Sequence, residues 1–282
     1  MADLANATVN AQCPICGSGS DATLRIVRGF RIAQCTTCRF VFVNPRPALD
    51  ELVTLYAGAK TNPFFSEAFE SITSERPALR SVLQQIRRYV PTGRLLEVGC
   101  GRGDFLILAQ SAGFSVTGCD FFGAHKRPEG IVSYDGTLAQ AQLSSNSFDI
   151  VVIRNVLEHV FDPNMELNEI RRILKSDAYL YIKVPNVSFE HGLGCRLVFG
   201  REHDFDPPFH LNHFSSASLM ALLQKAGFEF ISWSLERPTL YSLGVKHFAR
   251  LSGYGLIQTA FFLTQGRAFP KIVLSCVARK TC

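Results

Sequence analysis

LLEVGCGRGDF, residues 95–105, is an apolar run that gives way to three glycines at every second position and ends on an aspartate. Glycines packed that closely indicate a turn whose backbone passes near a ligand or another segment, because glycine has no side chain to hold a neighbour away. Two acids, Glu97 and Asp104, flank the turn. An apolar strand that runs through such a turn into a helix is typical of the first unit of a doubly wound α/β sheet.

The chain around this stretch alternates between apolar strands and amphipathic helices. Strands are expected at residues 94–99, 115–120, 131–135, 148–153, 178–185, 228–237 and 271–280. Helices are expected at residues 48–58, 76–90, 104–113, 163–174 and 215–227. Continuous apolar strands that alternate with helices predict a parallel sheet covered on both faces, here a Rossmann-like doubly wound sheet of seven strands.

The charge of the glycine turn indicates which ligand it holds. In a GxGxxG dinucleotide turn the third glycine would stand at residue 104, but this chain has Asp104 there, a negative charge where a pyrophosphate would lie. Acids around the turn instead favour a cationic nucleoside such as S-adenosylmethionine, which carries a sulfonium and no phosphate. Asp120 ends the second strand, 23 residues after Glu97, where a carboxylate can accept hydrogen bonds from both ribose hydroxyls.

Five motifs resemble the successive motifs of class I S-adenosylmethionine-dependent methyltransferases, in particular the subgroup that acts on small molecules. Besides the glycine turn they are GCDF, SFDIVVIRNVLEHVFDP, EIRRILKSDAYLYIKVPN and HFSSASLMALLQKAGF, and the resemblance covers residues 90–235. KSDAYL departs from the Lys-Pro-Gly-Gly turn of the family, at a connection far from the expected site. The resemblance implies a set of cofactor-binding residues: Glu97, Gly99, Cys100, Gly101, Gly103, Asp120, Phe121, Thr137, Leu138, Arg154 and Asn155. Within that set, Cys100 is expected to be a small packing residue rather than a nucleophile.

Four of the nine cysteines form two CxxC pairs near the N-terminus, with 18 residues between the pairs. Two such knuckles can complete a tetrahedron of thiolates around a structural Zn²⁺, which makes residues 1–47 a zinc-ribbon module. The expected ligands are Cys13, Cys16, Cys35 and Cys38. A pair of redox CxxC motifs is the weaker alternative. The other cysteines are scattered and no signal peptide is expected, which favours the reducing cytoplasm.

The domain organisation follows from these segments. Residues 48–90 are expected to form a helical connector, and residues 91–282 form the Rossmann-like methyltransferase domain with an apolar and basic insertion at 238–270. The resemblance implies that the N-terminal part packs on the catalytic domain and helps to cover its active site. With 47% hydrophobic and 19% charged residues, the composition excludes a disordered polyelectrolyte.

Three histidines are candidates for catalysis. His159 lies in LEHV after the fourth strand, while His210 and His213 lie in a long loop at 186–214 that returns to the helix at Ser215. His210 is the preferred base or acceptor-orienting residue. His159 is a base, a wall of the pocket or a histidine satisfied by backbone groups. A metal site in this loop is disfavoured because the spacing matches no standard ligand set.

The 238–270 insertion permits two interpretations. It is either a core or dimer helix, or an interfacial helix that meets a lipid-linked acceptor and places the protein at the inner face of the membrane. No segment is long and apolar enough to span a bilayer.

The sequence therefore predicts an enzyme that methylates oxygen or carbon of a small-molecule or of a lipid- or sugar-linked acceptor. An RNA methyltransferase that uses the ribbon for recognition is the alternative. RNA binding is disfavoured because residues 95–235 lack a basic groove, and the intact cofactor turn argues against a third reading, a non-catalytic adaptor.

Overall fold

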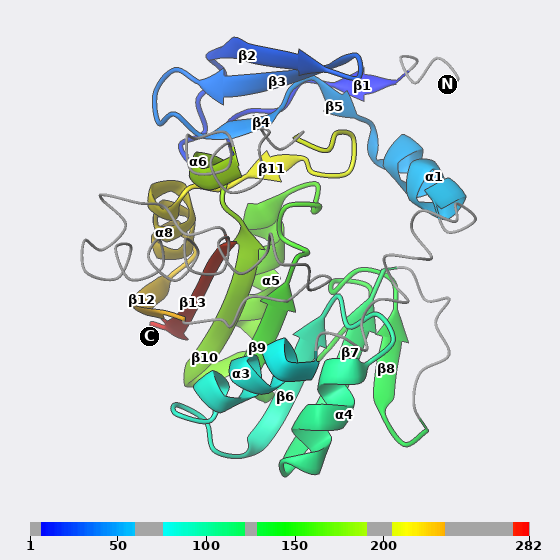
Figure 1. Ribbon diagram of the computed structural model, residues 1–282, viewed down its shortest axis with the longest axis vertical. Helices are drawn as coiled ribbons and strands as arrows, with labels where there is room; N and C mark the ends of the chain where they lie inside the picture. Colours follow the sequence, from blue (N-terminus) through cyan, green and yellow to red (C-terminus); the bar gives the residue numbers. More distant parts are fainter. Residues whose placement is uncertain (1–6, 60–75, 122–128, 191–204, 235–272, 282) are drawn as a thin grey trace, which may run out of the picture.

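The computed structural model describes residues 7–59, 76–121, 129–190, 205–234 and 273–281. Seven strands form one sheet in the order β12-β13-β10-β9-β6-β7-β8, which is the lower part of the molecule in Figure 1. Their bounds are β6 (Gly93–Val98), β7 (Phe114–Asp120), β8 (Val132–Asp135), β9 (Phe148–Arg154), β10 (Leu174–Pro185), β12 (Phe228–Trp233) and β13 (Val273–Lys280). The number of strands and their positions agree with the sequence prediction.

The sheet is mixed, so the prediction of a wholly parallel sheet was wrong. The strands β10, β9, β6, β7 and β8 are parallel to one another, whereas β13 lies between β10 and β12 and runs antiparallel to both. Apolar periodicity identifies a strand but is the same in both directions along the chain, and therefore it could not reveal that β13 is reversed.

Helices cover both faces of the sheet, as expected for a doubly wound fold. The helices are α3 (Arg76–Ile86), α4 (Asp104–Ser111), α5 (Pro163–Ile173) and α8 (Ser216–Lys225). Consecutive strand residues alternate between two core clusters: Leu95 packs with α3 and α4, and Leu96 packs with α5 and α8. The central strands are thus buried on both sides, which favours the strand ends as the place for a ligand.

Side chains at the helix N-termini set where two of these helices begin. Asp162 caps α5 by accepting from the backbone N–H of Asn164, and Pro163 occupies the first helical position. Ser215 and Ser218 form a capping box at the start of α8. Both caps satisfy backbone groups that have no partner inside the helix.

The N-terminal part forms a second sheet above the first. The elements of the N-terminal part are β1 (Thr8–Val9), β2 (Asp21–Val27), β3 (Phe30–Cys35), β4 (Val41–Val43), β5 (Arg46–Pro47) and α1 (Leu49–Ala59), of which β1 and β5 pair as a separate two-stranded sheet. A strand from the long loop, β11 (Asn212–His213), completes a four-stranded sheet in the order β11-β4-β3-β2. Figure 1 shows β11 in yellow beneath the blue strands of residues 1–47. The short helix α6 (Val187–Glu190) lies near the same junction.

The N-terminal sheet shares its core with the large domain. Phe40 and Phe42 belong to the same buried cluster as α5 and α8, and the Phe40 ring lies 5.4 Å from that of Phe214. The backbone carbonyl of Pro14 accepts hydrogen bonds from Asn164 and from Lys225. The two sheets are therefore packed as one body around continuous apolar contacts.

Parts of the predicted organisation fall outside the described residues. The 238–270 insertion and residues 60–75 of the predicted connector are among them. Within the described part of the chain, no helix has the length and hydropathy needed to cross a membrane.

Candidate functional site

The glycine turn connects β6 to α4 at the carboxyl edge of the sheet. Gly99, Gly101 and Gly103 all have positive φ, at 72°, 50° and 81°. A Cβ at Gly99 would lie 2.1 Å from Cγ2 of Val156, so no larger residue fits there without displacing Val156. A Cβ at Gly101 would meet no described atom within 4 Å, so the turn opens onto free space at that residue. This combination leaves an exposed backbone surface against which a ligand can lie.

Asp120 is bound to the turn. Its Oδ2 accepts a hydrogen bond from the backbone N–H of Gly101, with a distance of 2.7 Å, and the residue is 7% exposed. Asp120 ends β7, the strand beside β6. Phe121 follows and is exposed. The carboxylate and the glycine backbone therefore face the same small region.

The charge argument from the sequence treated Glu97 as a free acid, but in the structure this residue is paired with a cation. It is buried, and its Oε1 accepts from Arg154 at 2.8 Å. Burial raises the pKa of Glu97 to about 7, against the opposing effect of the Arg154 guanidinium. Arg154 also stacks over the ring of Phe105 at 5.0 Å. The Arg154 cation thus offsets part of the negative charge that the sequence predicted at the turn.

The other predicted cofactor residues lie at the ends of the neighbouring strands. Thr137 follows β8 and its backbone N–H donates to the side chain of Gln140, while Leu138 is buried in the core. Asn155 follows β9 with a φ of 51° and is exposed. Cys100 is buried against Gly118, in agreement with a packing role. The structure thus brings the predicted set to one edge of the sheet, where ligands of such folds bind.

Two of the three candidate histidines lie together. The ring centroids of His159 and His210 are 4.7 Å apart, in an edge-to-face arrangement. Nδ1 of His159 lies 3.0 Å from the backbone carbonyl of Phe209 and 3.1 Å from the hydroxyl of Tyr56. Burial lowers the pKa of His159 and raises that of the Tyr56 phenol. Tyr56 comes from α1, so the connector supplies a residue to this cluster.

His213 occupies a different environment. It lies in β11, paired with Val41 of β4, and its ring packs edge-on against Phe205 at 4.9 Å. The residue is buried, and its ring lies 6.4 Å from that of His210. His213 is therefore part of the junction with the N-terminal sheet. His203 and Asp204, earlier in the same loop of the sequence, lie outside the described residues.

Sequence reasoning missed Tyr56 and Glu158. Glu158 directly precedes His159 and is buried, and its backbone carbonyl accepts from the N–H groups of Leu211 and Asn212. These bonds hold the loop that carries His210 against the segment that carries His159. The sequence offered one signal, an acid next to a histidine in LEHV, but none for Tyr56, which reaches the site only through tertiary packing.

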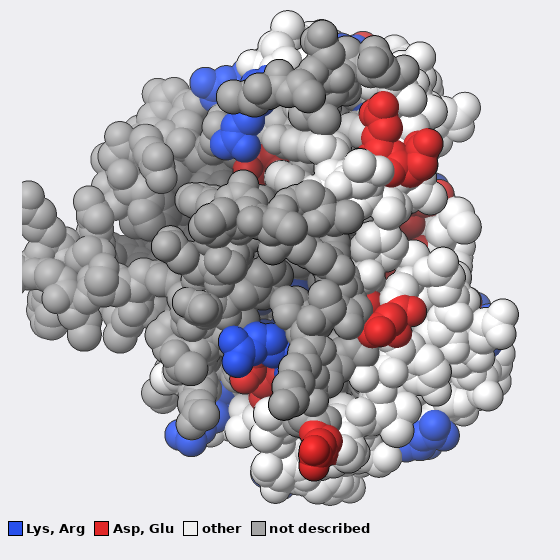
Figure 2. Space-filling model, turned by 90° about the vertical axis from the view of Figure 1, so that its right-hand side faces the viewer, with Lys and Arg blue, Asp and Glu red and all other residues white. Residues whose placement is uncertain are grey.

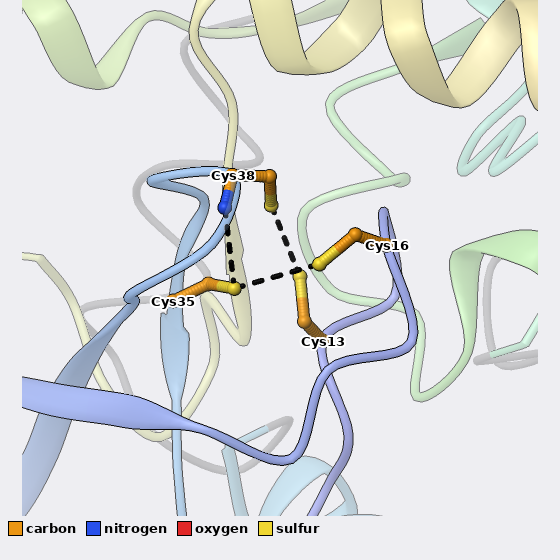
Figure 3. Close-up of side chains that lie close together, drawn as sticks. All are labelled: Cys13, Cys16, Cys35 and Cys38. Atoms are coloured by element: carbon orange, nitrogen blue, oxygen red, sulfur yellow. Dashed lines mark hydrogen bonds between the residues drawn. The ribbon is translucent and has the colours of Figure 1, made fainter.

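The four N-terminal cysteines meet in space as their spacing predicts (Figure 3). Sγ of Cys13 lies 3.4 Å from that of Cys38, and Sγ of Cys16 lies 3.5 Å from that of Cys35. All four sulfur atoms are within 4.8 Å of one another. Sulfur atoms bound to one Zn²⁺ at about 2.3 Å lie about 3.8 Å apart, so this donor set fits the ion closely.

Sequence comparison identifies relatives of this chain. Residues 46–232 match the family model of a methyltransferase domain. A protein of Mycolicibacterium smegmatis named as a probable S-adenosylmethionine-dependent methyltransferase is 31% identical over 142 residues, 48% of this chain and 51% of that protein. A ubiquinone biosynthesis O-methyltransferase of Histophilus somni is 25% identical over 189 residues, 57% of this chain and 79% of that protein. The chain thus spans about half the length of the mycobacterial relative.

Solved structures share the fold. The 1,6-didemethyltoxoflavin-N1-methyltransferase of Burkholderia thailandensis, with S-adenosylhomocysteine bound, has a TM-score of 0.54 at 16% identity and covers 93% of this chain and 100% of that one. A Thermotoga maritima methyltransferase, described as a possible histamine N-methyltransferase, has a TM-score of 0.52 at 22% identity and covers 78% and 97% of the two chains. At these identities the likeness concerns the fold alone.

Proposed function

The chain belongs to the methyltransferase-domain family whose model matches residues 46–232. From this membership we propose that the protein transfers a methyl group from S-adenosylmethionine to an acceptor. The acceptor is a small molecule or a lipid- or sugar-linked compound, and oxygen or carbon receives the methyl group. The observation that carries this proposal is the pairing of Asp120 with the open glycine turn.

The residues around the turn suit the nucleoside. The backbone of Gly101 and Gly103 would lie against the methionine moiety, and the Asp120 carboxylate would accept from the ribose hydroxyls. Thr137, Leu138 and Asn155 would flank the adenine and the methionine end. S-adenosylmethionine supplies a methyl group on a sulfonium, a carbon already activated for displacement. The protein mainly aligns donor and acceptor, and such alignment can contribute about 7 to 11 kcal/mol.

His159 and His210 are the acceptor-side residues of this proposal. An acceptor hydroxyl or acidic carbon must lose a proton when it is methylated, and a positioned imidazole can take it or can orient the group. The edge-to-face contact of the two rings supports a shared role for them on the acceptor side. His213 is a weaker candidate because it is buried in β11.

The proposal is tested with two readouts on purified protein. We expect S-adenosylhomocysteine to bind in calorimetry, while NADH and ATP do not. His210→Ala should lower methyl transfer from labelled S-adenosylmethionine to an extract of small molecules and leave S-adenosylhomocysteine binding intact. Absence of binding to the wild type would overturn the proposal, and a His210→Ala variant with full turnover would remove His210 from it.

We also propose that the four cysteines hold a structural Zn²⁺. The chemistry of the set supports this, because four thiolates fill a tetrahedral ion and leave no position for water. The ion would stabilise a segment whose sheet is small and which borrows β11 from the other domain.

Recognition of RNA is not favoured by the face drawn in Figure 2. The Lys and Arg of the described residues that are visible there stand in separate groups and form no continuous basic stripe. A protein that tracks a phosphate backbone concentrates its cations. Contact of the 238–270 segment with a membrane or with a second copy stays a prediction, because that segment lies outside the described residues.

A further inference from the structure

Glu158, His159 and His210 form a cluster of three side chains that can each supply one metal-ligand atom. One ligand atom from each residue lies within 4.8 Å of the other two. Nε2 of His159 and Oε1 of Glu158 are 3.9 Å apart, too far for a direct hydrogen bond. Ligands about 2.1 Å from a tetrahedral cation lie about 3.4 Å from each other, so a small rotation of the carboxylate would bring the set to bonding distance.

The other nitrogen of His159 is held in the way that metal-binding histidines are held. A backbone carbonyl can only accept, so the 3.0 Å contact between Nδ1 and the carbonyl of Phe209 places the proton on Nδ1. Nε2 then carries the lone pair, on the side of Glu158. The hydroxyl of Tyr56 lies 3.1 Å from Nδ1 and donates to the same carbonyl at 3.2 Å. Such outer contacts fix both the tautomer and the orientation of a ligand.

Hydrogen bonds of the protein itself hold together the two segments that carry the three residues. The carbonyl of Glu158 accepts from the N–H of Leu211 at 2.8 Å and from that of Asn212 at 3.0 Å. The side-chain amide of Asn212 donates to the backbone carbonyl of Val160 at 2.8 Å. The 158–160 segment and the loop that carries His210 are thus fastened on both sides of the cluster. Glu158 is buried at 2% exposure, whereas the His159 side chain is 29% exposed, so the cluster has one open side.

We propose that Glu158, His159 and His210 bind a divalent transition-metal cation that keeps an open coordination position. Two imidazoles and one carboxylate suit Zn²⁺, Fe²⁺, Co²⁺ or Mn²⁺ rather than Mg²⁺ or Ca²⁺, which prefer oxygen ligands throughout. A catalytic metal site typically has three protein ligands and one open position, whereas the four-cysteine site of this chain would fill all four positions.

The role of this cation rests on the proposed function. Its open position would take the hydroxyl oxygen of the acceptor and lower the pKa of that hydroxyl, and the proton would pass to water. The acceptor oxygen then forms the new bond to the methyl carbon while the bond from that carbon to sulfur breaks. The electron pair stays on sulfur, which becomes a neutral thioether. The cation in this way takes over the task assigned above to a histidine base.

Cobalt(II) added to protein whose four-cysteine site is filled with zinc tests the site by visible absorption. We expect one equivalent to give weak d–d bands without thiolate-to-metal charge transfer, because the ligands are nitrogen and oxygen. Glu158→Gln and His210→Ala should abolish these bands. His213→Gln, a histidine of the same loop outside the ligand set, should retain them. Tyr56→Phe should weaken cobalt affinity by about ten-fold, as expected for a residue that supports a ligand.

Three results would overturn the proposal: no d–d absorption in the wild type, thiolate bands alone, or bands that survive both Glu158→Gln and His210→Ala. Circular dichroism and S-adenosylhomocysteine binding on the same samples establish that each variant is folded. Calorimetry with S-adenosylhomocysteine also separates the two proposals. If the protein binds cobalt but not S-adenosylhomocysteine, the methyltransferase proposal is wrong and the metal site stands. If it binds S-adenosylhomocysteine but not cobalt, the metal site is wrong and the methyltransferase proposal stands.

Discussion

Oδ2 of Asp120 and the backbone nitrogen of Gly101 are joined by a hydrogen bond of 2.7 Å. A carboxylate at the end of one strand thereby holds the turn at the end of the neighbouring strand. In the proposed complex the same side chain binds the ribose, so the shape of the turn and the grip on the nucleoside depend on one residue. This linkage makes Asp120 the most informative position on the cofactor side.

Asp120→Ala should weaken S-adenosylhomocysteine binding by ten-fold or more in calorimetry. The variant loses charge-assisted hydrogen bonds to the ribose, each worth about 1.5 kcal/mol or more, and also releases the N–H of Gly101. Asp177→Asn is the matched control, because Asp177 is exposed, adopts a φ of 58° that Asn tolerates and lies near the start of β10. Equal affinity in wild type and Asp120→Ala would mean that the ribose is held elsewhere.

Gly99→Ala and Gly101→Ala should separate folding from binding. Gly99→Ala forces a methyl group onto Val156 at 2.1 Å, and overpacking with a positive φ should lower the free energy of unfolding by about 3 kcal/mol. Gly101→Ala has room and should cost only about 1 kcal/mol. Its methyl group would enter the space proposed for the cofactor, so this variant should fold and bind S-adenosylhomocysteine poorly.

Urea unfolding and calorimetry check both variants. Gly101→Ala with normal affinity would show that the cofactor does not lie against that residue. Gly99→Ala with wild-type stability would contradict the close approach to Val156.

The sequence predicted the elements of the fold better than their arrangement. Strand and helix positions depend on local periodicity and caps, which explains why Asp162 and the turn at Gly99 could be placed correctly. The reversal of β13 has no local signature. The same holds for β11, two residues whose pairing with β4 is fixed by the fold around them.

The candidate site was incomplete for a similar reason. Glu97 and Arg154 were each predicted to lie near the cofactor, but their ion pair depends on β6 and β9 being neighbours, which strand order alone decides. Tyr56 reaches His159 across 103 residues of chain. Contacts of this kind arise from tertiary packing and produce no recognisable spacing pattern in the sequence.

Glu97→Gln should change how stability depends on pH. The pKa of Glu97 in the folded protein is raised from 4.5 to about 7, so the folded state holds this proton more tightly than the unfolded state. The contribution of this tighter proton binding to the free energy of unfolding is therefore fully present below about pH 4.5, and it is lost as the pH rises through about 7. Relative to Glu97→Gln, the wild type should lose at most about 3 kcal/mol over this range.

Urea unfolding of both proteins at several pH values measures this difference. The comparison isolates Glu97, because Glu166, whose pKa burial also raises to about 7, titrates in both proteins. A difference that stays flat between pH 4.5 and 7 would show that Arg154 keeps the Glu97 carboxylate ionised throughout.

Loss of the proposed zinc should disturb the histidine loop as well as the N-terminal sheet. The backbone N–H of Val43 donates to the carbonyl of Leu211 at 2.9 Å, so β4 holds the residue next to His210. Cys38→Ser, or chelation, should release one zinc and raise hydrogen exchange at residues 41–43 and 211–213, while S-adenosylhomocysteine still binds. Thr37→Ser, in the same knuckle but not a ligand, should leave exchange unchanged. If exchange at 211–213 were insensitive to zinc, the loop would be held by its bonds to the Glu158 carbonyl alone, and the four-cysteine site would have no influence on the acceptor side.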